Sequence, residues 1–455
     1  MPVSSKPRPP LPPSPHLVVG LARSGQAAAR LLASRGERVI GVDEGRPEGA
    51  ERLTADGVEV ILDVDGTASV VEAASVVKSP GVPADAPAIV AARERGLPVI
   101  GELELAWRML PNRFLGITGT NGKTTVAELL GHVWRTAGEP VAVAGNVGTP
   151  LSSLVGELDP ETTVVCEASS FQLEDADAFA PECGVLLNVT PDHLDRHHDL
   201  AAYLSAKLRL FARQGNDDVC VYNGSDPALR GVDLGGCGRR AAFCTARDDR
   251  DDCQAVVSGS VLELWGEPLL ELSELALIGP HNAENAAAAA IAAATQGIDR
   301  EAVAEALRTF PGVPHRLERV RERDGVLYVN DSKATNVAAA VAALRSFDRG
   351  VHAILGGSTK GGGFAGLAAA VAERCTACYL IGEAAPSLER DLGPAWEAGV
   401  RRSRCDGLAD AVHAAAADAV AGDVVLLAPA CASFDCYTDF EQRGEHFRAL
   451  VEELG

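Results

Sequence analysis

The sequence predicts an α/β protein of three domains: a Rossmann-like N-terminal domain, a central domain of the P-loop ATPase type and a Rossmann-like C-terminal domain. Three observations support this fold class. Short apolar runs alternate with helical patterns, Gly-rich turns follow two of these runs, and a breaker-rich stretch, FPGVPHRLERV, precedes the last third. The length of 455 residues suffices for about two to four domains. We expect the three domains at residues 16–108, 109–311 and 312–455.

The bulk composition excludes two classes of function. A net charge of −22 argues against a surface built for nucleic acid, which needs a basic face. No apolar run reaches membrane-spanning length, and the N-terminus lacks the apolar segment of a signal peptide. We therefore expect neither nucleic acid nor a membrane as a partner, and a cytosolic location. The 11 cysteines are scattered, which predicts reduced thiols.

The first 15 residues, MPVSSKPRPPLPPSP, combine many prolines with a few polar residues. This composition is typical of a segment that forms no packed core. We expect residues 1–15 to form a disordered tail.

The N-terminal domain opens with HLVVGLARSGQAAARLLASRGERVIGVDE, which predicts a strand, a tight turn, a helix and a second strand. Gly20, Ala22 and Gly25 follow the G-x-G-x-x-G pattern with one departure, and Asp43 ends the second strand. The pattern indicates a mononucleotide-binding unit, although Ala22 weakens the case for NAD. A later turn, KSPGVP, follows another apolar run and could face the same crevice. Ordinary turn chemistry remains the alternative for both turns.

The central domain begins with RFLGITGTNGKTT, an apolar strand that runs through a Gly-rich loop into a helix. The loop is a variant of the Walker A motif, because Ile117 stands where that motif has its first glycine. Glycines let backbone N–H groups converge on phosphate, and the helix N-terminus adds its positive end. Lys123 can bridge phosphates, and a threonine hydroxyl can hold Mg²⁺. These features predict phosphate binding.

Two later strands of the central domain end in polar groups. Glu167 follows one apolar run, and Asp192 and His193 follow another. Ligands gather at the carboxyl ends of parallel strands, and carboxylate and hydroxyl oxygens suit Mg²⁺. We expect a metal site there, with His193 beside it, and place His197 and His198 on the surface.

Lys207 lies on a predicted helix and carries an unusual residue type for this chain. The sequence has six lysines against 41 − 6 = 35 arginines. Arginine does not deprotonate, whereas lysine can lose its proton and react. Lys207 is therefore a candidate reactive group, and an ordinary charge on a solvated helix face is the alternative.

The C-terminal domain again alternates apolar strands with helices, and its strands run into polar, small-residue turns. The polar groups at these strand ends are Asp331, Lys333, Thr335, Lys360 and Ser433, with Phe434 beside them. An Ala-rich helix before this domain begins with Asn282 and Asn285, which could cap it or reach a base.

Taken together, several stretches resemble the Mur ligase family, ATP-dependent enzymes that add amino acids to the peptidoglycan precursor. They are TGTNGKTT, SSFQLE, NVTPDHLDRH, PHRLE, NDSKATN, GGSTKGGGF and PACASFDCYTDFEQRG. The resemblance runs from about residue 17 to the C-terminus and implies that D-glutamate is added to UDP-N-acetylmuramoyl-L-alanine through an acyl phosphate. The Pro-rich tail lies outside the pattern, and GGSTKGG lacks an acidic residue that is common shortly before its lysine.

The resemblance also implies cofactors, partners and residue roles. It implies ATP and Mg²⁺ as cofactors, the two substrates as partners, and a monomer. The implied catalytic residues are Lys123, Glu167, His193 and Lys207. The implied ATP contacts are Gly119, Thr120, Asn121, Gly122, Lys123, Thr124, Thr125, Asn285, Arg316 and Asp331. The implied contacts of the UDP substrate are Leu21, Ala22, Asp43, Ser79, Gly81 and Asn146. The implied D-glutamate contacts are Lys333, Thr335, Lys360, Ser433 and Phe434. The implied metal ligands are Thr124, Glu167, His193 and, if carbamylated, Lys207.

Three other functions remain open from the sequence. Folylpolyglutamate synthase shares the phosphate loop and domain order but lacks SSFQLE. A nucleotide-binding regulator would need no intact set of Lys123, Glu167, His193 and Lys207. An NAD dehydrogenase is suggested only by the turn from Gly20 to Gly25.

Overall fold

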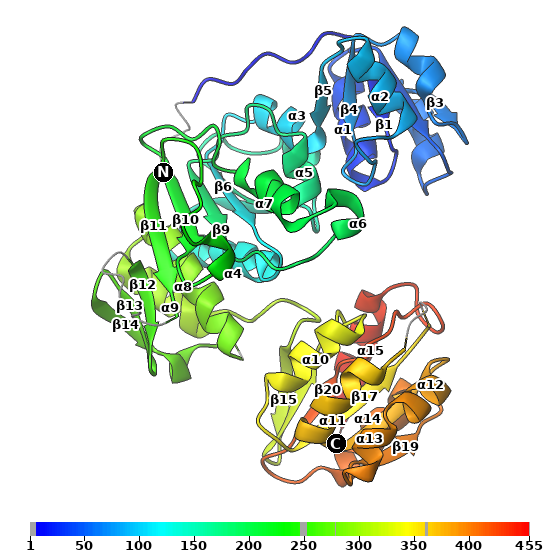
Figure 1. Cartoon of the computed structure of the whole chain (residues 1–455), viewed down its shortest axis with the longest axis vertical. Helices are drawn as coiled ribbons and strands as arrows, with labels where there is room; N and C mark the ends of the chain where they lie inside the picture. The colour runs from blue at the N-terminus through cyan, green and yellow to red at the C-terminus, as the bar shows by residue number, and fades with distance from the viewer. Residues whose placement is uncertain (1–5, 246–252, 278, 360–362, 455) are drawn as a thin grey trace. The chain divides into compact units, whose positions relative to one another are not determined.

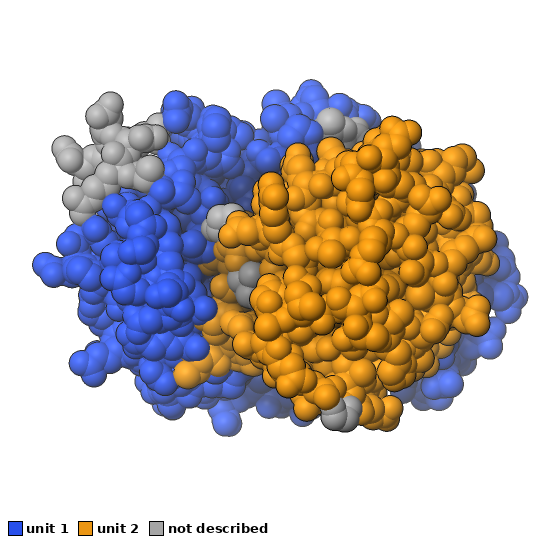
Figure 2. Space-filling model, turned by 90° about the horizontal axis from the view of Figure 1, so that it is seen from below, with its two compact units in different colours: residues 1–275, 283–308 blue, residues 276–282, 309–455 orange. Residues whose placement is uncertain are grey.

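The computed structural model describes residues 6–245, 253–277, 279–359 and 363–454. The chain forms two compact units, residues 1–275 with 283–308 and residues 276–282 with 309–455, which are coloured separately in Figure 2. The first unit holds two β-sheets and the second holds one. The predicted three-domain α/β fold class is therefore confirmed.

The N-terminal sheet is wholly parallel, with the strand order β3-β2-β1-β4-β5 and with helices beside it (Figure 1). Its first strand, β1, is buried throughout because both faces are covered: Val18 packs into one core cluster, and Leu17 and Val19 pack into the other. The elements are β1 (His16–Val19), α1 (Arg23–Ser34), β2 (Val39–Asp43), β3 (Glu59–Leu62), β4 (Ser75–Lys78), α2 (Pro87–Glu94), β5 (Val99–Gly101) and α3 (Glu102–Met109).

The central sheet has nine strands in the order β14-β13-β12-β11-β10-β9-β6-β8-β7. Its strands are β6 (Phe114–Thr118), β7 (Val141–Gly145), β8 (Thr163–Glu167), β9 (Cys183–Leu186), β10 (Val219–Asn223), β11 (Arg239–Cys244), β12 (Cys253–Ser258), β13 (Val261–Leu264) and β14 (Glu267–Glu271). Its helices are α4 (Lys123–Thr136), α5 (Ser170–Glu174), α6 (Leu194–His197), α7 (Leu200–Leu208), α8 (Pro280–Thr295) and α9 (Arg300–Thr309).

The order of the central strands explains where its polar groups meet. Strand β6 lies between β8 and β9, and all three run in parallel. The loops that leave their carboxyl ends therefore share one edge of the sheet. The strand order begins with β14 and β13, which extend the sheet at the end away from β7 and pair in antiparallel fashion.

The C-terminal sheet has the order β15-β16-β20-β17-β18-β19 and is parallel except for β15. Its strands are β15 (Glu318–Arg323), β16 (Val326–Asn330), β17 (Val351–Gly356), β18 (Cys375–Ile381), β19 (Arg401–Arg404) and β20 (Val424–Leu427). Its helices are α10 (Val337–Arg345), α11 (Ala368–Arg374), α12 (Ala385–Asp391), α13 (Gly393–Glu397), α14 (Leu408–Asp418) and α15 (Phe440–Glu453). Short 3₁₀ turns complete the chain at Ala50–Asp56, Thr67–Val71, Leu151–Leu154, Pro227–Leu229, Leu272–Glu274 and Ala365–Leu367.

Two expectations about the chain as a whole need correction or comment. Cys244 and Cys253, on neighbouring strands, form a disulfide, so the expectation of reduced thiols is wrong for this pair. The other nine cysteines are free thiols. In the described part of the chain, no helix combines the length and apolar character needed to cross a bilayer.

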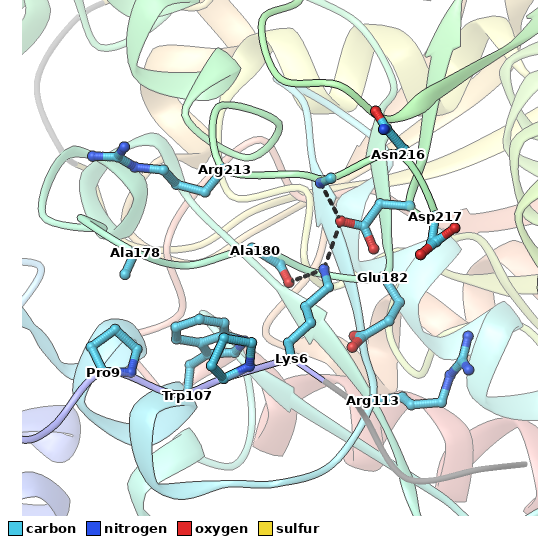
Figure 3. Close-up of a pocket in the computed structure, with 13 residues that line it drawn as sticks. Lys6, Pro9, Trp107, Arg113, Ala178, Ala180, Glu182, Arg213, Asn216 and Asp217 are labelled. Carbon is cyan, nitrogen blue, oxygen red and sulfur yellow. Dashed lines mark hydrogen bonds and ion pairs between the residues drawn. The ribbon is translucent and has the colours of Figure 1, made fainter.

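The expectation of a disordered tail is wrong for residues 6–15, while residues 1–5 lie outside the described residues. Lys6 Nζ donates to the Ala180 carbonyl at 2.5 Å and pairs with Asp218 at 2.8 Å. Figure 3 shows Lys6 pointing to that carbonyl, with Trp107 and Pro9 beside it. Further along, Leu11 packs against the core of the N-terminal domain. We call residues 6–15 the N-terminal strap, because they contact both domains of the first unit.

Arg8 provides the strongest set of contacts in the N-terminal strap. Its guanidinium lies 4.1 Å from the ring centroid of Trp107, and it donates to the carbonyls of Leu110 at 3.1 Å and Asn112 at 2.8 Å. Proline fixes φ, so an extended Pro-rich segment has little backbone freedom to lose when it docks. The composition of this segment indicated disorder because composition does not record the partners that the segment meets in the folded chain.

We expect Arg8→Ala to lower the apparent free energy of unfolding by about 2 kcal/mol, because it removes a cation–π contact and two hydrogen bonds from a charged group. Thermal and urea unfolding of the full chain would measure the change. Arg35→Ala, at the exposed end of α1, is the matched control. Equal unfolding curves for the two variants would show that the N-terminal strap adds nothing to stability.

Candidate active site

The loop after β6 requires its glycines. Gly122 has φ +87°, and a Cβ atom there would lie 2.4 Å from Oδ1 of Asn285. Helix α4 begins directly after this residue, at Lys123, so the positive end of the helix dipole lies at the loop. Asn285 and the phosphate-binding candidates are thus brought together. Those candidates are Gly119, Thr120, Asn121, Gly122, Lys123, Thr124 and Thr125.

Asn188, which the sequence analysis did not single out, braces this loop. Its Oδ1 accepts from the backbone N–H groups of Thr120 at 3.1 Å and Asn121 at 2.9 Å. Its Nδ2 donates to the carbonyl of Asn121 at 3.1 Å. Asn188 follows β9 in the stretch NVTPD, and its position after an apolar strand is the signal that could have identified it.

Two lysine amines converge on one backbone carbonyl. Lys123 Nζ donates to the carbonyls of Gly119 at 2.9 Å and Thr120 at 2.8 Å. Lys207 Nζ donates to the same Gly119 carbonyl at 2.7 Å and lies 4.2 Å from the ring centroid of Tyr203. The structure therefore joins the end of α7 to the loop from Gly119 to Thr125, which we call the phosphate loop.

Lys207 is not a surface charge, because only 1% of the residue is exposed. Burial and, second, the positive charge of Lys123 lower the pKa of Lys207 to about 7, against the opposing influence of Asp192. The alternative of an ordinary charge on a solvated helix face is therefore wrong. A lysine in this state is neutral for much of the time near pH 7.

Glu167 ends β8 as a buried carboxylate and is bound to the loop that follows β7. Its Oε1 accepts from Nδ2 of Asn146 at 2.9 Å, and its carbonyl accepts from the Asn146 N–H at 2.9 Å. Gly145 makes this contact possible, since a Cβ atom there would lie 2.2 Å from the Glu167 carbonyl oxygen. Asn146 and Glu167, predicted from separate stretches, therefore form one pair.

The loop after β9 presents His193 with a left-handed backbone, φ 51°. Its N–H donates to Oδ1 of Asp192 at 2.9 Å, and its exposed ring lies 4.9 Å from the ring centroid of Phe171. The expected surface location holds for His198 but is wrong for His197. His197 is buried, with Nε2 at 3.0 Å from Ser170 Oγ, and stacks on Phe171 at 5.4 Å.

In the N-terminal domain, the two predicted turns lie against each other. A Cβ atom on Gly20, which has φ +87°, would lie 2.6 Å from Cγ2 of Val82 and 2.9 Å from Cβ of Ser79. Asp43 accepts from the Leu21 N–H at 2.6 Å, so it belongs to the same group. The space around Gly81 is open, because an added Cβ there would meet nothing within 4 Å. Leu21, Ala22, Asp43, Ser79 and Gly81 thus form one locality, and their role remains a prediction.

In the second unit, Asp331 and Lys333 follow β16. Burial raises the pKa of Asp331 to about 6, while the Leu317 N–H and the charges of Arg316 and Lys333 act in the opposite direction. Lys333 Nζ lies 5.7 Å from the ring centroid of Phe440. The backbone N–H of Thr335 donates to the carbonyl of Lys333 at 2.8 Å.

The remaining residues for which D-glutamate contacts were expected differ in their surroundings. Ser433 is buried after β20, whereas Phe434 is 70% exposed. Ser358, after β17, pairs with Ala432, so the ends of β17 and β20 lie together. Lys360 lies outside the described residues, and its role stays a prediction.

Arg443 organises this region and was missed by the sequence analysis, although it lies within the quoted stretch FEQRG. It is buried and donates to Oγ and the carbonyl of Ser332, at 3.0 and 2.9 Å, and to the carbonyls of Cys431 and Ala432, each at 3.2 Å. Burial lowers the pKa of Arg443 to about 10, and the group still stays charged at neutral pH. Arg443 therefore ties the turn before Ser433 to the segment before Lys333.

The donor groups of the central domain suit Mg²⁺ shared with phosphate. Within the described residues, no three His, Cys, Asp or Glu side chains come together as a metal-binding cluster. Mg²⁺ commonly takes one or two carboxylates together with substrate phosphates and water. The Glu167 carboxylate and the hydroxyl of Thr124, in the first turn of α4, are donors of this kind.

Three family models match the chain in order. The Mur ligase MurD-like N-terminal domain matches residues 14–101, the Mur ligase middle domain matches residues 117–293, and the Mur ligase glutamate ligase domain matches residues 315–431.

Curated proteins match over nearly the whole chain. The UDP-N-acetylmuramoylalanine–D-glutamate ligase of Salinibacter ruber is 42% identical over 464 residues, which covers 96% of this chain and 97% of that protein. The enzyme of the same name from Anaeromyxobacter dehalogenans is 44% identical over 457 residues, with the same coverage of both chains.

Among solved structures, UDP-N-acetylmuramate–alanine ligase from Thermotoga maritima has a TM-score of 0.59 at 20% identity, covering 97% of this chain and 99% of its own. MurF ligase from the same organism, in complex with ADP, has a TM-score of 0.57 at 18% identity, covering 92% and 96%. At these identities the structural similarity shows the fold alone.

Proposed function

The chain belongs to the Mur ligase family, and we infer that it is the ligase that adds D-glutamate to UDP-N-acetylmuramoyl-L-alanine at the expense of ATP, in peptidoglycan precursor synthesis. Relatives of that name at 38–44% identity cover 96% of the chain, which leaves no ground for a folate enzyme or an NAD dehydrogenase. The observation that carries the inference within the molecule is the convergence of Lys123 and Lys207 on the Gly119 carbonyl. An intact pair of amines at the phosphate loop speaks against a regulator without activity.

The chemistry explains why such a site needs charge and position more than a reactive side chain. A carboxylate is a poor acyl donor, so we propose that ATP converts the L-alanyl carboxylate to an acyl phosphate, which the amine of D-glutamate then attacks. Each step gathers negative charge on oxygen atoms. Preorganised N–H groups and cations stabilise that charge, and correct placement of the reactants supplies much of the remaining rate.

Lys123 and the loop from Gly119 to Thr125 are proposed to hold the ATP phosphates. The Lys123 amine already faces the loop interior through its bonds to Gly119 and Thr120. Phosphate oxygens would replace these carbonyls as stronger, charged acceptors. Asn285 lies against Gly122 and is proposed to contact the same nucleotide. Arg316 and Asp331 belong to the second unit, and their part in ATP binding stays a prediction.

Glu167 and Thr124 are proposed to hold Mg²⁺, whose chemistry there would be to neutralise phosphate charge. The bond from Asn146 fixes the orientation of the Glu167 carboxylate. Asn146 is also proposed to contact the sugar nucleotide at its reactive end.

Lys207 is proposed to carry a carbamate. The neutral amine attacks CO₂, an N–C bond forms, and the proton leaves to solvent. With a pKa of about 7, about half of the amines are neutral at pH 7, against roughly 1 in 2,500 for an unperturbed lysine. The resulting carboxylate would join His193 as a second pair of metal ligands.

The D-glutamate pocket is proposed to use two cations for two carboxylates. Lys333 and Lys360 would supply the charges, while Thr335, Ser433 and Phe434 would supply the remaining contacts from the strand ends. The turn fixed by Arg443 gives Ser433 a rigid support.

A cytosolic location and a monomeric state also stay predictions.

A coupled ADP-release assay tests the function. We expect turnover with UDP-N-acetylmuramoyl-L-alanine and D-glutamate but not with L-glutamate or L-alanine as the acceptor. Lys123→Ala should lower the rate by ~10²–10³, because it removes a charge directed at the transferred phosphoryl group. Far-UV circular dichroism would verify that the variant folds. Turnover of the variant close to wild type would exclude this role for Lys123.

For Lys207, we expect Lys207→Arg to be nearly as inactive as Lys207→Ala, although it keeps the charge. Arginine cannot deprotonate in a protein and so cannot form the carbamate. Enzyme equilibrated with ¹³C-bicarbonate should show a carbamate carbon by NMR, and Lys207→Arg should lose that signal. Lys6→Arg, which retains the ion pair with Asp218, is the control and should keep it. If Lys207→Arg retained at least about half of normal turnover, the carbamate hypothesis would be abandoned.

For the acceptor pocket, we expect Ser433→Ala to raise the KM for D-glutamate about tenfold, with the KM for ATP nearly unchanged, because one hydrogen bond to a charged ligand is lost. Steady-state kinetics with each substrate varied in turn would measure both values. Ser403→Ala, on the exposed strand β19, is the matched control. An equal rise in both KM values would mean that Ser433 does not discriminate the amino acid.

A further inference from the structure

Arg196 joins the two domains of the first unit at a single turn. Its Nη1 donates to the carbonyl of Pro80 at 2.9 Å, and its Nη2 donates to the carbonyl of Val82 at 3.1 Å. Arg196 lies on α6 of the central domain, whereas Pro80 and Val82 form the KSPGVP turn after β4. That turn carries Ser79 and Gly81, for which the family resemblance implies contacts with the sugar nucleotide.

The guanidinium is held in place on its other sides by the central domain. It lies 4.0 Å from the ring centroid of Phe171 and 3.4 Å from Oε2 of Glu174. Only 15% of the Arg196 side chain is exposed. Interactions of such a group are screened less than those of a surface arginine.

A buried ion pair also holds the KSPGVP turn in place. Lys78 Nζ lies 2.8 Å from Oδ2 of Asp175, across the two domains, and donates to the Val82 carbonyl at 2.8 Å. Both residues are buried. The Val82 carbonyl therefore accepts from a cation of each domain, so the turn cannot shift without breaking bonds to both.

The backbone connects Arg196 directly to His193. The N–H groups of Arg196 and His197 donate to the His193 carbonyl at 3.1 and 3.0 Å. His197 anchors α6 to α5 through Ser170 and through Glu174, at 3.1 Å. The position of the His193 loop thus depends on α6, and α6 is attached to the KSPGVP turn by the Arg196 side chain.

A second contact between these domains is weaker. Arg23 Nη2 donates to the Gly148 carbonyl at 2.6 Å, near Asn146, but this bond is exposed to solvent. Exposed interactions of this kind contribute little, because water competes for both partners. Arg196 is the better candidate for transmitting a change from one domain to the other.

We infer that Arg196 is a positioning residue that couples the KSPGVP turn to the loop that carries His193. Sugar nucleotide bound on the KSPGVP turn would then order the His193 loop beside the reacting carboxylate. The inference rests on the proposed roles of the two loops. Coupling of this kind is reciprocal, and its usual size is about 5- to 150-fold in affinity.

The test compares the full-length wild type with Arg196→Gln, Arg196→Lys and Arg300→Gln. Arg300 is the matched control, because it donates to the carbonyls of Leu264 at 3.2 Å and Glu267 at 3.0 Å within the central domain. We expect Arg196→Gln to raise the KM for UDP-N-acetylmuramoyl-L-alanine about tenfold and to lower kcat, with the KM for ATP nearly unchanged. Arg196→Lys should fall between wild type and Arg196→Gln, and Arg300→Gln should match wild type.

Hydrogen exchange provides a readout that a merely structural role would not change. In wild type, saturating sugar nucleotide without ATP should slow exchange of the amides at residues 193–199. In Arg196→Gln, this slowing should be lost even at saturation. If Arg196→Gln fails to fold, Arg196→Lys serves in the same two measurements.

Two results would overturn the inference: equal behaviour of Arg196→Gln and Arg300→Gln, or an equal rise in the KM values for sugar nucleotide and ATP. Failure of the proposed function would look different. It would be seen in the wild type, as absence of ADP release with both substrates present.

Discussion

The carbonyl of Gly119 is the constraint on which the candidate site depends. Two lysine amines donate to it, one from the start of α4 and one from the end of α7. Burial lowers the pKa of the Lys207 amine, and the positive charge of Lys123 lowers it further. Lys123 remains the candidate cation for phosphate. Two chemically similar residues that share one backbone oxygen are thus proposed to have different roles.

A second constraint is the attachment of the N-terminal domain to the central domain. The buried pair of Lys78 and Asp175, the carbonyl bonds of Arg196 and the N-terminal strap all cross between these domains. A buried ion pair is costly to break, because either partner would be left unpaired in a low-dielectric setting. The residues proposed for the sugar nucleotide and the phosphate loop therefore belong to one compact unit, and those proposed for D-glutamate belong to the other.

In the C-terminal domain, the buried Arg443 side chain connects backbone segments to one another. Arg443 uses its guanidinium on the hydroxyl and carbonyl of Ser332 and on two further carbonyls, instead of on a carboxylate. Backbone carbonyls at strand ends are otherwise hard to satisfy, and an arginine offers several donors in a fixed geometry. The turn before Ser433 is consequently held by hydrogen bonds from Arg443.

The sequence by itself determined the fold class, the family and the stretches that carry chemistry, because these depend on local patterns: strand, Gly-rich turn and helix in order. It also indicated Lys207, through the rarity of lysine. Only the tertiary structure decided that Lys207 is buried on the Gly119 carbonyl, that His197 is buried while His193 is exposed, and that residues 6–15 dock on the folded chain. Burial, pKa and long-range hydrogen bonds such as those of Arg196 arise from segments far apart in the chain, and no local pattern records which segments meet.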